Sequence, residues 1–174
     1  MSSAIAAQIS GTIDFTTAPN LTGGFVTGGG GTTTVHFNNP LHVDFATGDY
    51  SSTVGQPVNF DSIAWTGSGT SSMLTSSNSP EWAFTIGATT YSFDLLSLES
   101  TSFTQAALDI TGHGRAHITG FADTPGMFSF HGTGHEFIVS TVVSAAAPEG
   151  GSAIVLLGLG LFAVEGLRRK LANA

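Results

Sequence analysis

The chain has 174 residues, of which 41% are hydrophobic and only 9% are charged, well below the roughly 25% of an ordinary soluble domain. Residues 1–147 hold ten carboxylates against a single basic residue, Arg115, which gives that part a net charge of −9 and excludes nucleic-acid binding. The chain has no cysteine, which excludes thiol catalysis, thiolate zinc sites and disulfides.

The N-terminus contains Ala4-Ile5-Ala6, which fits the small-x-small pattern of a signal-peptidase site with Ala7 as the first mature residue. No basic or long apolar segment precedes this pattern in the sequence. A truncated leader and a disordered, alanine-rich start both fit these residues. Residues 1–7 are therefore interpreted as the remnant of a signal peptide or as a flexible N-terminus.

The body, residues 8–144, is predicted to consist of short strands. Apolar and polar residues alternate at 9–15, 33–37 and 41–45, as in half-buried strands. The gaps are rich in glycine and serine, and nothing before the tail sustains a helical period. We therefore predict an all-β fold, an antiparallel β-sandwich of roughly eight to ten strands, with a closed β-barrel as the alternative.

The segment 82–95 predicts a hairpin in a defined register. Gly87-Ala88 fits a two-residue type II′ turn, because glycine occupies its first position. This turn sets Phe84 opposite Tyr91 and Trp82 opposite Phe93, so that the aromatic residues share one buried face. The apolar phase changes at Leu95-Leu96, which indicates a β-bulge.

The segment 107–118 has apolar or glycine residues at even positions and polar residues at most odd ones. It predicts either one long strand bent at its glycines, which we favour, or a hairpin with a loop at 112–114. Both versions place Asp109, Arg115 and His117 on the same polar face. A turn is predicted at 123–126, with proline and glycine in type II positions. Strands follow at 127–130 and 137–143, and their mutual register stays open.

Few residues suggest chemistry. His113 and His117 would lie about 13 Å apart on one strand and could not share an ion. His131 and His135 could converge across a tight turn near Glu136, which makes them weak metal candidates against the alternative of polar surface residues. No Ser-His-Asp order, nucleophile elbow or phosphate loop occurs. We therefore predict no catalytic, cofactor or metal site and no enzymatic activity, with Trp65 and Trp82 in the core.

The tail carries the most specific pattern. A linker and motif at 145–152 contain Pro148-Glu149-Gly150-Gly151-Ser152. An apolar run at 153–164 follows, and then the basic cluster Arg168-Arg169-Lys170. Residues 153–174 are predicted to be a hydrophobic helix with a basic end, shorter than the ~20 apolar residues that span a bilayer comfortably. The basic end would stay cytoplasmic and the acidic body outside.

This order of motif, apolar segment and basic cluster resembles the PEP-CTERM family of exosortase-sorted bacterial surface proteins, and most closely its Val-Pro-Asp-Ser-Gly variant. Pro148-Glu149 matches the first two positions of the family motif, whereas Gly150 replaces the second proline and Ala147 stands where valine is usual. The segments 82–98 and 108–130 also resemble bodies of this family. The family has no single biochemical activity that could be carried over.

The resemblance implies an exported protein that resides transiently in the inner membrane and is cut by an exosortase-type transpeptidase. It implies a cell-surface or extracellular-matrix location, with exopolysaccharide or other matrix proteins as partners. Two alternatives stay open: a carbohydrate-binding β-sandwich module, with or without calcium, and an ordinary C-terminal membrane anchor.

Overall fold

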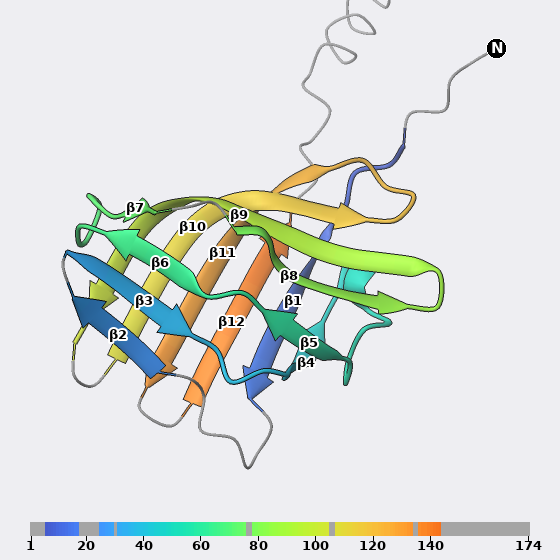
Figure 1. Ribbon diagram of the computed structural model, residues 1–174. Coiled ribbons are helices and arrows are strands. Elements are labelled where there is room, and N and C mark those ends of the chain that lie inside the picture. The colour runs from blue at the N-terminus through green and yellow to red at the C-terminus, as the bar shows by residue number, and fades with distance from the viewer. Residues whose placement is uncertain are drawn as a thin grey trace, which may run out of the picture.

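The computed structural model describes residues 6–17, 25–29, 31–75, 78–104, 107–133 and 136–143 (Figure 1). The described part is all-β apart from one short 3-10 helix, as the alternating pattern predicts. The elements in chain order are β1 Gly11–Thr17, β2 Phe25–Gly29, β3 Thr32–His36, β4 Leu41–Ala46, η1 Gly48–Tyr50, β5 Pro57–Phe60, β6 Ile63–Thr66, β7 Met73–Leu74, β8 Asn78–Ile86, β9 Thr89–Phe103, β10 Ala107–Ile118, β11 Thr124–Thr133 and β12 Glu136–Val143.

Eight strands form a closed antiparallel barrel in the order β1-β12-β11-β10-β9-β8-β5-β4. The remaining strands form a small sheet in the order β2-β3-β6-β7, which lies across the barrel strands in Figure 1. The barrel closes because β1 pairs with β12 on one side and with β4 on the other. The architecture is therefore the predicted alternative, a barrel, supplemented by a second sheet, and the preferred simple sandwich is corrected.

The hydrophobic core lies between the barrel wall and the small sheet. The small sheet contributes Val35, Ile63 and Trp65, each at most 2% exposed. On the barrel side, the Phe15 ring centroid is 5.0 Å from both the Trp82 and the Phe60 centroids. Aromatic pairs at such separations stabilise a core by about 0.5–1.5 kcal/mol each beyond the burial of their area.

The aromatic hairpin of β8 and β9 has the predicted register. Phe84 pairs with Tyr91 and Trp82 pairs with Phe93. Gly87 has a φ of +60°, and no described residue other than glycine has a positive φ, which fits a type II′ turn. Trp82 and Phe93 are buried and Phe84 is partly buried. The bulge is also confirmed, since Leu96 has no partner in the ladder between β9 and β10.

β10 is one continuous strand, so the bent-strand prediction is confirmed and the hairpin at 112–114 is not formed. Its even positions from Leu108 to Ile118 are all buried. Gly114 is required by close packing, because a Cβ atom there would lie 2.4 Å from the Phe93 ring and 2.0 Å from the Asp94 carbonyl oxygen. The barrel wall at this point has room only for glycine.

The predicted turn at 123–126 is wrong. Thr124 opens β11, and Pro125 pairs with Arg115 of β10. Proline is tolerated there because the described part of β12 ends opposite Gly126, so no described strand on that side bonds to the N–H that proline lacks. The chain turns earlier, at Gly120, whose φ is +92°, and the Phe121 N–H donates to the Ile118 carbonyl at 2.9 Å.

The described residues begin at residue 6 and end at residue 143. Near the N-terminus, Ile9 is completely buried and its N–H donates to the Thr124 hydroxyl at 2.9 Å. Residues 144–174, with the motif at 148–152, the predicted helix and the basic cluster, lie outside the described residues. Within the described ranges, no helix has the length and apolar character needed to cross a membrane.

Candidate functional site

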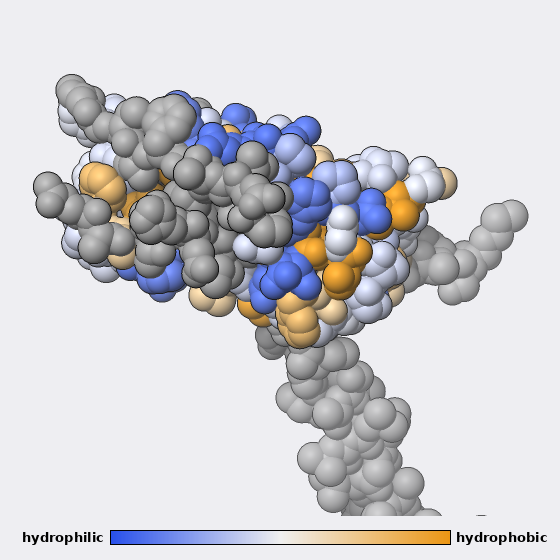
Figure 2. Space-filling model, turned by 90° about the horizontal axis from the view of Figure 1, so that it is seen from below, coloured by the Kyte–Doolittle hydropathy of each residue, from blue (hydrophilic) through white to orange (hydrophobic). Residues whose placement is uncertain are grey.

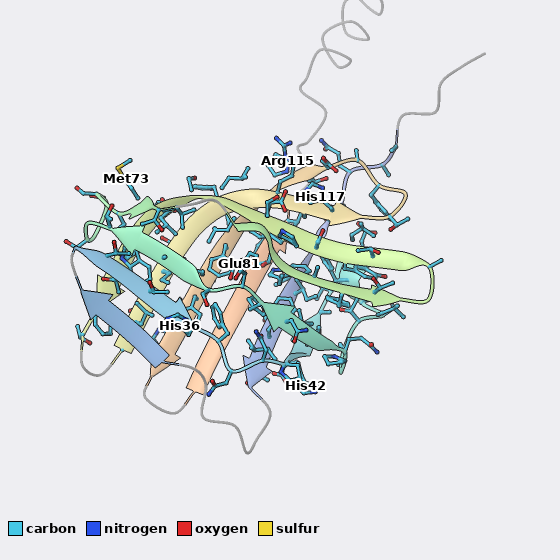
Figure 3. The ribbon with its side chains drawn as sticks, in the orientation of Figure 1. His36, His42, Met73, Glu81, Arg115 and His117 are labelled. Carbon is cyan, nitrogen blue, oxygen red and sulfur yellow. The ribbon has the colours of Figure 1, made fainter. Side chains whose placement is uncertain are left out.

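The outer face of β9, β10 and β11 gathers most of the titratable side chains that the structure brings together. The odd residues of β10 point away from the core, because side chains alternate along a strand. We call this surface the histidine–carboxylate face, and it comprises Asp94, Glu99, Asp109, His113, Arg115, His117, Asp123 and His131. Figure 3 shows Arg115 and His117 on this side of the barrel.

His117 lies between two carboxylates. Its Nε2 is 3.0 Å from Asp94 Oδ2, and its Nδ1 is 2.8 Å from Asp123 Oδ1. Both ring nitrogens are therefore within hydrogen-bond distance of a carboxylate oxygen. We call these three residues the His117 clamp.

Two further histidines pair with carboxylates across strands. His131 Nδ1 bonds Asp109 Oδ1, as expected from their opposite positions in β10 and β11. His113 Nε2 lies 3.6 Å from Glu99 Oε2, and a register shift in β9 brings that carboxylate to it. All four side chains are more than half exposed, so water and salt screen both pairs strongly. These pairs are weak compared with the His117 clamp.

The predicted weak metal site is only partly described. His131 is engaged with Asp109, His135 lies outside the described residues, and Glu136 opens β12 with a side chain that is likewise outside them. In the part of the chain that the structure describes, no three histidine, aspartate or glutamate side chains converge as metal ligands. His113 and His117 contact different carboxylates, in accord with their predicted separation on one strand.

Trp65 and Trp82 are buried, as predicted, at 2% and 1% exposure. Neither ring can therefore form a surface platform for stacking a sugar. Burial, and secondarily the neighbouring Asp49 carboxylate, raises the pKa of Tyr50 above its ordinary value, so its phenol stays protonated at neutral pH. This tyrosine serves packing, with its ring centroid 6.5 Å from that of Trp82.

Sequence reasoning missed most carboxylates of this face. It placed Asp109, Arg115 and His117 together from the period of β10, but the carboxylates that contact His117 come from β9 and from the loop before β11. The register between neighbouring strands was the signal that could have found them. Sequence reasoning also missed Glu81 of β8, which is completely buried and lies inside the molecule in Figure 3. Glu81 lies within the register shift between Asn78 and Trp82, which interrupts the alternation there.

We expect His117→Gln to lower the free energy of unfolding by about 1 kcal/mol, because a glutamine amide cannot contact Asp94 and Asp123 from both edges of a planar ring as the imidazole does. The matched control is His113→Gln, whose single contact is 3.6 Å long and exposed, and which should change stability by less than about 0.5 kcal/mol. Urea denaturation of both variants measures the difference. Equal losses would show that the His117 clamp has no special role in stability.

Comparison with known proteins gives no match: no family model, no curated protein and no solved structure is significantly similar to this chain.

Proposed function

We propose that this chain is an exported structural or interaction protein of the bacterial cell surface or extracellular matrix, processed near its C-terminus by an exosortase-type transpeptidase. The observation that carries the proposal is the order of three features in the tail. Pro148-Glu149 follows a small-residue linker, the apolar run 153–164 comes next, and the basic cluster 168–170 ends the pattern.

The physics of this tail favours a transient stop over a lasting anchor. A permanent anchor gains stability with each buried apolar residue, so anchoring alone favours a longer run without Glu165. A transient stop needs only to hold the motif at the outer interface until it is cut. Snorkelling of the arginine and lysine side chains allows a short apolar segment to do this.

The core of the body supports a structural or interaction role over sugar binding by exposed aromatic rings. Both tryptophans lie in the core, so neither can stack on a sugar at the surface. Figure 2 shows hydrophilic and hydrophobic residues interspersed on the described surface of one face of the molecule. With its excess of carboxylates, the body suits matrix polysaccharide or neighbouring matrix proteins as partners better than nucleic acid.

The mass of the protein released from its native cells tests this proposal. We expect the mature form to lack Leu156–Ala174, because a cut in or near the motif removes the apolar run and the basic cluster. Peptide mapping of the same material locates the new C-terminus and any glycan. Native protein that retains the peptide with Arg168-Arg169-Lys170 at full occupancy would contradict the proposal and indicate a membrane-anchored domain.

A further inference from the structure

The small sheet has two edges, which differ in their contacts with the rest of the protein. At the β7 side, the neighbouring Gly69 and Thr101 exchange two backbone hydrogen bonds of 2.8 and 3.1 Å, which tie this end to β9. The Ser72 hydroxyl adds a bond to the Thr101 hydroxyl. An isolated bridge therefore attaches the segment next to β7 to the barrel.

β2 forms the other edge. It pairs with β3 from Phe25↔His36 to Gly29↔Thr32, and no other described strand pairs with it. Figure 1 shows β2 at the rim of the small sheet, beyond β3 as seen from β6. Antiparallel pairing uses the N–H and C=O groups on one side of a strand, so β2 has a second row of such groups along this rim.

Within its described residues 25–29, β2 lacks the protection that proteins usually give to open strands. Natural edges carry charged side chains, proline or bulges that prevent pairing with another chain. β2 has the sequence Phe-Val-Thr-Gly-Gly, and its register with β3 is continuous. In the sequence, no aspartate, glutamate, lysine or arginine occurs between Asp14 and Asp44. The edge is therefore uncharged on a strongly acidic body.

We infer that β2 is the surface through which two copies of this chain associate, by antiparallel pairing of β2 with β2 of the second copy. The acidic body repels a second copy, and this uncharged edge is where two copies approach at the lowest electrostatic cost. An antiparallel edge is self-complementary about a two-fold axis, so the same residues serve both partners. With the β7 side already tied to β9, pairing stops at the dimer.

The inference goes beyond the proposed function and does not depend on it. A strand of five residues buries much less than the ~1,600 Å² of a standard interface, so the dimer is expected to be weak, with association at micromolar or higher concentration. Molecules held together at a surface would reach such local concentrations. Added salt should strengthen the dimer, because it screens the repulsion between two acidic bodies.

The test compares Thr27→Lys with wild type by sedimentation equilibrium of the full chain, in a non-ionic detergent that shields the apolar run 153–164. Thr27 is chosen because it pairs with Thr34, whereas its neighbour Val26 pairs with the buried Val35. The wild type should dimerise reversibly with rising concentration. The variant should need at least tenfold higher concentration, since two lysines would meet near the two-fold axis.

The matched control is Ser129→Lys, which adds the same charge to an exposed position on β11, a strand paired on both sides. It should dimerise like the wild type. Hydrogen exchange gives a second readout that needs no mutation: the amides of residues 25–29 should gain protection as concentration rises. A monomeric wild type, or equal dimerisation by Thr27→Lys and Ser129→Lys, would overturn the inference. Neither outcome bears on C-terminal processing, which the native mass tests separately.

Discussion

Phe93→Ala should lower the free energy of unfolding by about 3–5 kcal/mol. Phe93 is completely buried, and its ring stacks between those of Trp82 and Phe128 at centroid distances of 6.2 and 6.3 Å. The same ring lies over Gly114, where no side chain could fill the space left by its removal. The loss therefore combines the free energy of burying the ring with the cost of a cavity that cannot collapse. Urea denaturation followed by tryptophan fluorescence measures it.

Phe84→Ala is the matched control. It removes the same side chain from the same hairpin, but Phe84 is only partly buried. Its ring stacks on Tyr91 at 5.2 Å and on Trp82 at 5.9 Å, near the turn end of the hairpin. We expect about half the loss of Phe93→Ala, because less apolar area leaves water at this position on folding. Equal losses for the two variants would contradict the packing described for the core.

Gly114→Ala should lower the free energy of unfolding by about 3 kcal/mol. The new methyl group would overlap the Asp94 carbonyl oxygen and the Phe93 ring, and neither can move without displacing β9. Gly126→Ala is the matched control, because its methyl group would touch the same ring at 3.1 Å and requires only a small shift. Thermal and urea denaturation should rank Gly114→Ala well below Gly126→Ala in stability. The reverse order would show that β9 and β10 approach each other less closely.

Local sequence patterns were sufficient to predict the register of the aromatic hairpin and the two faces of β10. Glycine at the first turn position and two aromatic residues on either side allow only one register that keeps the rings together, and that register is found. In β10, the alternation extends over the whole strand, so it predicts the buried and exposed faces correctly. The bulge at Leu96 could be predicted because the apolar phase changes within one sequence segment.

The closed barrel could not be predicted from local patterns, since it depends on pairing between distant segments. β1 and β12 lie at opposite ends of the body, and no local pattern specifies their register. The prediction of a turn at 123–126 was wrong for a similar reason. Pro125 fits in β11 because the described part of the neighbouring strand β12 ends opposite Gly126, and the sequence around Pro125 does not show this. The carboxylate partners of His117 likewise come from separate elements, so their convergence follows from the fold alone.

The pairing of the first strand with the last sets the order in which this body can fold. Gly11 pairs with Val143, so β1 lacks one of its two neighbours until the end of β12 is available. Contacts between such distant segments form slowly, because the long intervening chain must first be ordered. For a chain delivered from its N-terminus, β1 can pair early with β4, but the barrel closes only after Val143 has emerged. Closure is thus the final folding step, and it coincides with the arrival of the linker that begins at residue 145.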